Sequence, residues 1–368
     1  MSLLVSSPES AHFALPVTNT GELISLTLQP QSGEGILELF RRLARQLGEH
    51  ASKPLHLLIF GNASASAATN DVLRKTIGRV DWPMTWVEGA DCNGSPIAGI
   101  QVHAFTGDVE RIEFNGQIVA SVFTEGGARQ CLVGGLTPAD KTLSRAEQTR
   151  HTLEDLQTIL ASAGFDLADT VRTWFFLENI LSWYDEFNQA RTKIYSGVEF
   201  RTGSLPASTG VGAKNPAGTA LALAAWTFRP LESNARASEV ASPLQCPAPA
   251  YASSFSRAME IHSDGGRRLF ISGTASIAPG GNTMCVGDVR KQIELTMDVV
   301  EAMLRSRGFT FADLARATAY FRHATDAGVF AEWLTANQLT EMPVVSARCD
   351  VCRDDLLFEL EAEAETEF

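Results

Sequence analysis

The chain has few residues that could cross-link it or hold it in a membrane. Six cysteines are scattered over 368 residues, unlike the dense disulfide framework of a small secreted domain, so we expect reduced thiols. The longest apolar runs, such as LALAAW from Leu221, fall far short of the roughly 20 residues that a membrane helix requires. Met1 to Pro16 lacks the basic start and apolar core of a secretory signal. We therefore expect a cytoplasmic protein with no membrane contact.

Basic residues are also in the minority. The sequence has 30 Lys and Arg against 43 Asp and Glu, a formal net charge of -13. A nucleic-acid groove needs a basic face, so nucleic acid is not the expected partner, and any anionic ligand must be met by locally placed arginines. The 45% hydrophobic content and the length suffice for two or three folded domains.

Several common catalytic motifs are missing as well. No serine-hydrolase elbow, phosphate-binding glycine loop or dinucleotide fingerprint occurs, because the glycine-rich segments GGLTPADK and GVGAKNPAG lack the required spacing. The histidines are few and isolated, which favours structural roles. We expect no cofactor.

What the sequence does contain is an internal repeat. RQCLVGGL (129–136) and RRLFISGTA (267–275) are apolar, β-rich runs, and each precedes a segment with apolar residues at helical spacing. Each predicted helix ends at a glycine, Gly164 or Gly308, as a left-handed C-terminal cap requires, and a Gly-Phe-x-x-Ala-Asp turn leads into another strand. Both copies continue through a second helix into a final pair of strands.

The first hundred residues repeat the same order of elements in a more divergent form. The segment from Trp82 to Phe105 aligns without a gap on LPASTGVGAKNPAGTALALAAWTF, the end of the second copy. Each copy is predicted to be an α+β module whose helices cover one face of a sheet. The expected division is a degenerate module at 1–107, a second module at 108–230, a Pro, Ser and Ala-rich linker at 231–250, and a third module at 251–368.

This order of elements resembles the RidA (YjgF) superfamily, whose chorismate-mutase-like modules are typically homotrimers with ligand sites between neighbouring subunits. Three tandem modules imply a covalent pseudo-trimer and a monomeric chain. Within the superfamily the sequence is similar to the chorismatases in RLFISGTASI (268–277), GDVRKQ (287–292) and DVCRDDLLFELE (350–361). After SGTASI it departs from them, reading APGGNTMC in place of a Gly-His-containing segment.

The resemblance implies an activity and a set of site residues. Chorismatases convert chorismate to pyruvate plus a hydroxybenzoate or a dihydroxycyclohexadiene acid. The family's catalytic glutamate falls on Glu359 and its product-determining cysteine on Cys352. A cysteine there, together with a small residue such as Ala275, accompanies the 3-hydroxybenzoate product. Gly273, in the same SGTAS segment as Ala275, belongs to the implied substrate site.

The residues themselves also single out Glu359. On an extended strand Glu359, Glu361 and Glu363 share one face, and the matching positions of the second copy are Ala222 and Ala224. The shared fold therefore does not need a carboxylate there. In an apolar pocket the pKa of a carboxyl rises, so Glu359 could serve as a general acid. We expect the last glutamates to face water, although Glu361 is equally compatible with a place in the site.

A substrate with two carboxylates calls for guanidinium groups, which bind carboxylates through paired hydrogen bonds. The RidA resemblance places the carboxylate-binding arginine at Arg348, with a plain surface arginine as the alternative. Arg353 could bind substrate or pair with the neighbouring Asp354 and Asp355. From the second copy we expect Arg191, Tyr195 and Arg201 to face the third copy's site, between the two modules.

Other interpretations stay open at this point. Cys349 and Cys352 could be half of a zinc site, but no partner motif is present and residues three apart on a strand face opposite sides, so we expect no metal. Cys349 is then an inert buried thiol. The enzymatic alternative is deamination of 2-imino acids, with Arg348 as the carboxylate clamp. The non-enzymatic alternative is a small-ligand-binding member of the superfamily.

Overall fold

The computed structural model describes residues 21–89, 92 and 94–366. The segment Met1 to Pro16 lies outside these residues. No helix in the described part of the chain is long and apolar enough to cross a membrane.

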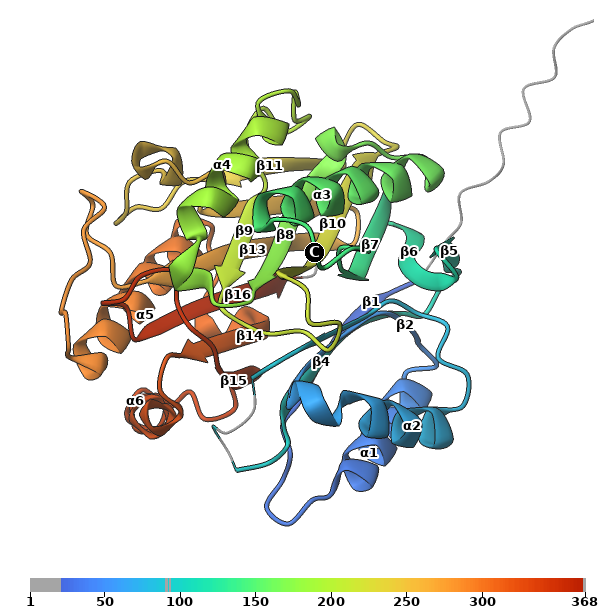
Figure 1. Ribbon diagram of the computed structural model, residues 1–368, viewed down its shortest axis with the longest axis horizontal. Helices are drawn as coiled ribbons and strands as arrows, with labels where there is room; N and C mark the ends of the chain where they lie inside the picture. The colour runs from blue at the N-terminus through green and yellow to red at the C-terminus, as the bar shows by residue number, and fades with distance from the viewer. Residues whose placement is uncertain (1–20, 90–91, 93, 367–368) are drawn as a thin grey trace, which may run out of the picture.

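The described residues form three β-sheets, each with two α-helices (Figure 1). The first sheet has the order β1-β4-β2-β3. The second has the order β5-β6-β7-β10-β8-β9, and the third has the order β11-β12-β13-β16-β14-β15.

The first module comprises β1 (Leu23–Leu28), α1 (Ile36–Glu49), β2 (Lys53–Gly61), α2 (Ser66–Ile77), β3 (Met84–Val87) and β4 (Ile97–Phe105). The second comprises β5 (Glu110–Phe114), β6 (Gln117–Glu125), β7 (Ala128–Leu136), α3 (Arg145–Ser162), β8 (Thr170–Leu177), α4 (Tyr184–Tyr195), β9 (Ala207–Val211) and β10 (Leu221–Pro230). The third comprises β11 (Arg236–Val240), β12 (Ala258–Ser263), β13 (Gly266–Ala275), α5 (Val289–Ser306), β14 (Leu314–Phe321), α6 (Ala327–Ala336), β15 (Val344–Arg348) and β16 (Phe358–Thr366).

These elements confirm the predicted α+β fold of three tandem modules. One assignment changes: residues 236–240, expected in a linker, form β11, the edge strand that pairs with β12. The low-complexity composition around this strand hid it, because an edge strand needs few apolar residues.

The long helices form where the repeat predicts them. A capping box between Ser144 and Glu147 starts α3, and Asp288 caps α5 by accepting a hydrogen bond from the backbone N–H of Lys291. Beyond the helix ends Gly164 and Gly308 have φ angles of 77° and 75°, the left-handed conformation expected of them. The predicted apolar positions of both helices are all buried, namely Leu153, Leu156, Ile159, Leu160, Met297, Val300, Met303 and Leu304.

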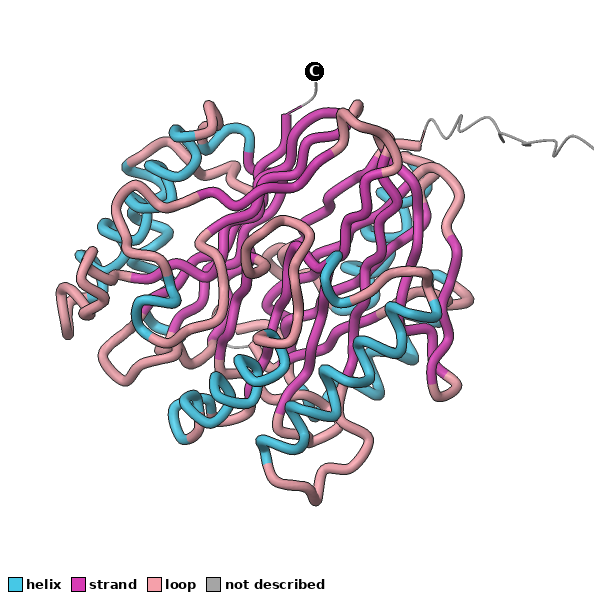
Figure 2. The backbone as a smooth tube through the Cα atoms, turned by 90° about the horizontal axis from the view of Figure 1, so that it is seen from above, coloured by secondary structure: helices cyan, strands magenta, loops and turns pink. Residues whose placement is uncertain are grey.

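The three sheets turn their inner faces toward one another, and the helices lie on the outside (Figure 2). The edge strand of each module packs on the next module: β3 contacts β7, β9 contacts β13, and β15 contacts β4. Phe60, Phe176 and Tyr320 occupy the same register in their sheets, and the ring of Phe60 lies 6.1 Å from that of Phe176 and 6.0 Å from that of Tyr320. The arrangement is a pseudo-trimer within one chain.

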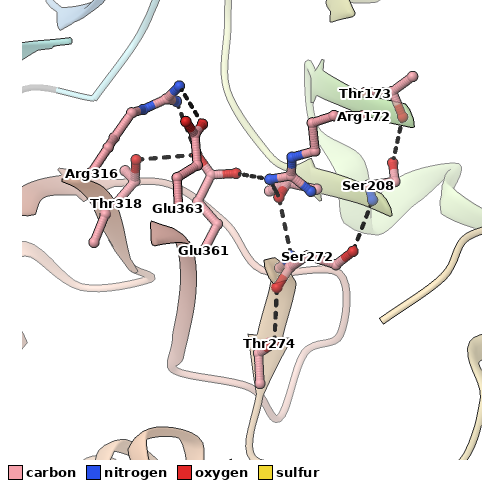
Figure 3. A network of polar contacts seen from close by, with 12 residues as sticks. Arg172, Thr173, Ser208, Ser272, Thr274, Arg316, Thr318, Glu361 and Glu363 are labelled. Carbon is pink, nitrogen blue, oxygen red and sulfur yellow. Dashed lines mark hydrogen bonds and ion pairs between the residues drawn. The ribbon is translucent and has the colours of Figure 1, made fainter. Parts of the chain in front are cut away.

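The expectation that Glu361 and Glu363 face water is wrong. Both are 3% exposed, on the face of β16 that meets the other modules. Arg172 Nη2 lies 2.6 Å from Glu361 Oε2, and Arg316 Nη1 lies 2.9 Å from Glu363 Oε1 (Figure 3). The alternating pattern gives the shared face correctly. It does not reveal that the helices cover the opposite face, which makes this one the interior.

Candidate active site

A cavity of about 820 Å³ lies between the second and third modules. The second module contributes α4 and β9, and the third contributes β13, β16 and the segment that follows the short helix at Ala248–Tyr251. The two modules are joined beside the cavity, because the backbone N–H of Ser208 donates to Ser272 Oγ at 2.8 Å and that of Gly273 donates to Thr209 Oγ1 at 3.0 Å. The residues that line the cavity include Tyr184, Asn188, Arg191, Ser208, Tyr251, Arg257, Gly273, Ala275, Cys352, Arg353 and Glu359.

Glu359 lies in the wall of this cavity, near the start of β16. Register through the central strands places Ala222 of the second module and Gly99 of the first at the equivalent position, so only the third module has a carboxyl there. Glu359 is 4% exposed, and its carboxyl has no hydrogen-bond partner among the described residues. Burial, assisted by the charge of Glu361, raises the pKa of Glu359 to about 8, although Arg172 and Arg257 oppose the shift. The group is therefore mainly protonated at neutral pH.

Gly273 makes room for this carboxyl. A Cβ atom at residue 273 would lie 1.9 Å from Glu359 Oε1 and 3.3 Å from Thr209 Cγ2. The backbone conformation at residue 273 is one that any residue can adopt. The glycine is therefore needed only because the Glu359 carboxyl approaches it so closely. The Gly of the SGT segment is therefore a packing partner of the candidate acid.

Replacing Gly273 with Ala should consequently displace the Glu359 side chain. We expect the variant to keep its fold, because a carboxyl beside a cavity can rotate away, and to lose activity by roughly ten- to hundredfold through misplacement of the acid. Gly265→Ala is the matched control, since the nearest atom to its added Cβ is the Ser263 hydroxyl at 3.8 Å. Equal activity of the two variants in a product-release assay would contradict this role for Gly273.

Two buried arginines face the cavity without an ion-pair partner among the described residues. Arg191 is 2% exposed, and its Nη2 donates to Asn188 Oδ1 at 2.7 Å. Arg257 is 3% exposed, and its Nε donates to the carbonyl oxygen of Cys246 at 3.0 Å. Arg191 Nε and Arg257 Nη2 are buried and have no hydrogen-bond partner in the described part of the chain. A buried guanidinium with free donors is costly unless a ligand satisfies it, and a carboxylate matches its geometry.

Aromatic rings hold both guanidinium groups in place. Arg191 Cζ lies 5.0 Å from the ring centroid of Phe187, and Arg257 Cζ lies 5.3 Å from that of Tyr251. Arg353 lies over the same Tyr251 ring at 5.5 Å and donates to the carbonyl oxygen of Gly281 at 2.7 Å. The described contacts of Arg353 do not include Asp354 or Asp355, so the pairing considered from sequence is not formed.

Cys352 lines the cavity as a neutral thiol. Burial and the nearby Glu359 raise its pKa to about 12, so it has little thiolate character at neutral pH. Ala275 also lines the cavity, and Gln245 Nε2 donates to its carbonyl oxygen at 2.9 Å. Cys349 lies elsewhere, with its Sγ 3.7 Å from the carbonyl oxygen of Glu88 in the first module. The described part of the chain holds no cluster of three or more His, Cys, Asp or Glu that could bind a metal ion.

Three residues expected in the site lie outside the cavity. Arg348 is exposed at the end of β15, where its backbone N–H donates to the carbonyl oxygen of Gly89. The reason is topological: β15 faces the first module, and the edge strand at the cavity is β9 of the second. Arg201 is paired with Asp169 at 2.7 Å on the outer surface. Tyr195 is packed against Phe200, with its ring 5.3 Å away, in the second module's own core.

Sequence reasoning missed Arg257, Tyr251 and Tyr184. Tyr251 and Arg257 lie just beyond residues 231–250, the stretch interpreted as a linker, whose composition gave no sign of a binding wall. Tyr184 begins α4, the helix that also carries Arg191. Spacing on that helix was an available signal, because residues 184, 188 and 191 fall on one helical face.

One family model matches part of the chain. Residues 101–220 match the family described as Endoribonuclease L-PSP. This match falls mainly on the second module, whose architecture the other two modules repeat.

Curated relatives are similar to a longer part of the chain. A 3-hydroxybenzoate synthase of Streptomyces hygroscopicus is 27% identical over 242 residues, which cover 58% of this chain and 68% of the relative. A chorismatase of the same organism is 26% identical over 239 residues, covering 59% and 67%. Over these lengths the chain is similar to both of these enzymes. A solved chorismatase structure has the same fold, with a TM-score of 0.65 at 20% identity over 93% of this chain and 99% of that one.

Proposed function

We propose that this protein is a chorismatase that hydrolyses chorismate to pyruvate and a hydroxybenzoate, with 3-hydroxybenzoate as the favoured product. The observation that carries the proposal is the pairing of a protonated carboxyl, Glu359, with two buried arginines whose donors are unsatisfied, in one cavity. A substrate with two carboxylates and an acid-labile enol ether fits this set of groups. The cavity is also within the roughly 300–1,000 Å³ typical of small-molecule sites.

The first role of the site is to bind both substrate carboxylates. Arg191 and Arg257 approach the cavity from different modules, so each can receive one carboxylate. Their hydrogen bonds to Asn188 and the Cys246 carbonyl fix the guanidinium planes before substrate arrives. A bound carboxylate also cancels the charge of Arg257, one of the two cations that oppose protonation of Glu359.

The second role is proton transfer to carbon. Glu359 donates its proton to the methylene carbon of the enolpyruvyl group, which leaves an oxocarbenium-like centre on the neighbouring carbon. Water adds to that centre and returns a proton to the Glu359 carboxylate. The resulting hemiketal breaks its bond to the ring oxygen and releases pyruvate with a dihydroxycyclohexadiene acid. Loss of one water from that acid gives a hydroxybenzoate, so no water is consumed in the overall conversion to the aromatic product.

The product isomer depends on which ring hydroxyl leaves, and Cys352 is placed to influence that step. Its thiol lines the same cavity as Glu359 and Ala275 and stays neutral. We expect Cys352→Ala to keep pyruvate release within about tenfold of the parent while changing the ratio of aromatic to dihydrodiol products. Chromatography of the products measures this ratio. Cys349→Ala is the matched control, and an unchanged product ratio in Cys352→Ala would remove Cys352 from this role.

The proposed chemistry predicts a specific pH dependence. The acid works only when protonated, and the pKa of Glu359 is raised to about 8, so kcat/KM should be level near neutral pH and fall about tenfold per pH unit above about 8. Pyruvate release measured across this range, with circular dichroism to verify folding at each pH, tests the prediction. Activity that rises through the same range would indicate a base in place of the acid.

The experiment that tests the proposed function compares two substrates. The purified protein is incubated with chorismate or with a 2-imino acid generated in the reaction mixture, and pyruvate, ammonia and aromatic acids are quantified. We expect 3-hydroxybenzoate and pyruvate from chorismate. Accelerated ammonia release from the imine, with chorismate left intact, would instead favour the deaminase activity of the superfamily.

A further inference from the structure

On the inner faces of the sheets, Glu361 and Glu363 each form an ion pair with an arginine. Glu359 forms no ion pair with the described residues. Arg172 of β8 binds Glu361 at 2.6 Å, and Arg316 of β14 binds Glu363 at 2.9 Å (Figure 3). Arg316 also lies 3.4 Å from Glu361, and His103 Nε2 lies 2.8 Å from Glu363. Glu359 is the next residue on the same face of β16, and the paired cations are already engaged.

Arg172 is linked to the cavity wall through Thr209. Thr209 Oγ1 accepts a hydrogen bond from Arg172 Nη2 at 2.6 Å and another from the backbone N–H of Gly273 at 3.0 Å. Gly273 is the residue against which the Glu359 carboxyl packs. Arg172 is 1% exposed, and its Nε and Nη1 have no hydrogen-bond partner among residues 21–89, 92 and 94–366. This guanidinium therefore has spare donors close to the candidate acid.

The elements packed around Glu359 carry further polar side chains. Tyr320 is its register partner on β14, and Gly273, Thr274 and Ala275 in the facing segment of β13 bring no titratable side chain. The remaining ionisable groups lining the same space are Tyr184, Asp185, Arg191, Lys193, Tyr251, Arg257, Cys352 and Arg353. Of the charges that act on Glu359, Glu361 favours the neutral form, whereas Arg172 and Arg257 favour the ionised form. Arg257 is open to a substrate carboxylate, but Arg172 is not a lining residue of the cavity.

We propose that Arg172 and Glu361 are positioning residues for the acid: their ion pair, formed between two modules, keeps Arg172 from neutralising an ionised Glu359, so that Glu359 holds its proton. The inference rests on the proposed function for the use of that proton, but the ion pair and its effect exist without substrate. It also gives Glu361 a role in the site through Arg172, without contact with the reacting atoms.

The two members of the pair should act in opposite directions. Glu361→Gln frees Arg172 for Glu359, and we expect the Glu359 titration to move down by roughly one to two pH units. Arg172→Gln removes the cation and leaves Glu361 charged, so the titration should move up by a similar amount. The double variant should titrate near the parent. A general loss of structure would not shift the Glu359 titration in opposite directions in the two single variants.

The measurement is the infrared carboxyl band of Glu359, followed against pH in the ligand-free protein and assigned by its disappearance in Glu359→Gln. Glu363→Gln is the control, because that carboxylate pairs with Arg316 and His103, and we expect no resolved shift. If a single variant does not fold, the double variant carries the test, since it removes the pair without leaving an unpaired charge. Single variants that shift together or not at all, or a double variant displaced by a full pH unit, would overturn the proposal.

This measurement is separable from the proposed function. A protein that leaves chorismate intact but shows the opposite shifts would contradict the proposed function and support the role of the pair. A protein that releases pyruvate, but whose Glu359 titration is unchanged in both single variants, would support the proposed function and contradict the role of the pair. Where both hold, the alkaline limb of the kcat/KM profile should move with the infrared titration in each variant.

Discussion

Glu359→Gln should lose pyruvate release from chorismate by about 10²- to 10⁴-fold, the range that a positioned general acid contributes. Glutamine keeps the size of the side chain but has no proton of suitable acidity to give to carbon. The melting temperature should stay close to that of the parent, because Glu359 is mainly neutral at pH 7 and makes no hydrogen bond with the described residues. Activity is measured by coupling pyruvate to its reduction, and stability is measured by thermal unfolding.

The matched control for this variant is Glu365→Gln on the same strand. Glu365 lies six residues further along β16, binds Ser25 Oγ at 3.0 Å and is far from the cavity lining. We expect it to keep parental activity. A Glu359→Gln protein as active as Glu365→Gln would remove Glu359 from the chemistry, whereas a large loss of melting temperature would mean that the carboxyl is structural.

The second large effect concerns Arg257. We expect Arg257→Gln to raise KM for chorismate by roughly ten- to hundredfold, since a hydrogen bond to a charged group contributes about 1.5–3 kcal/mol. kcat should change less if the lost contact binds ground state and transition state equally. Arg257→Lys should be intermediate, because an ammonium group keeps the charge and loses the paired donors.

Arg348→Gln is the control for the loss of a positive charge. Arg348 is exposed on β15 and faces the first module, outside the cavity. The two variants therefore distinguish the arrangement in the structure from the one expected by resemblance to RidA. A normal KM in Arg257→Gln together with a raised KM in Arg348→Gln would contradict the carboxylate-binding role assigned to Arg257.

The repeat made most of the fold predictable. Apolar periodicity and the terminal glycines gave the long helices, and comparing copies showed that Glu359 replaces Ala222, so its carboxyl serves something other than the fold. The position of a residue along a strand is a local property, and the alternating strand pattern predicts it well. The resemblance to RidA proteins placed the site between the second and third modules, where the cavity of about 820 Å³ lies.

Which faces of the modules meet was harder to predict. Glu361 and Glu363 resemble a solvated stripe in sequence because alternation does not say which face the helices cover. Arg348 was assigned to the cavity beside the third module. Its edge strand, β15, instead contacts the first module, because the edge strand of each module packs on the next module around the pseudo-threefold axis. Arg257 was missed because its neighbours resemble a linker. The positions of these glutamates, of Arg348 and of Arg257 all depend on contacts between modules. Such contacts produce no periodic pattern in the sequence.

The most direct test is the stoichiometry of the reaction with chorismate. Purified protein is mixed with a known amount of chorismate at neutral pH, and pyruvate and the remaining chorismate are both quantified over time. We predict one pyruvate for each chorismate consumed, no ammonia, and loss of this activity in Glu359→Gln. Chorismate that stays intact in the presence of the folded protein would contradict the proposed function.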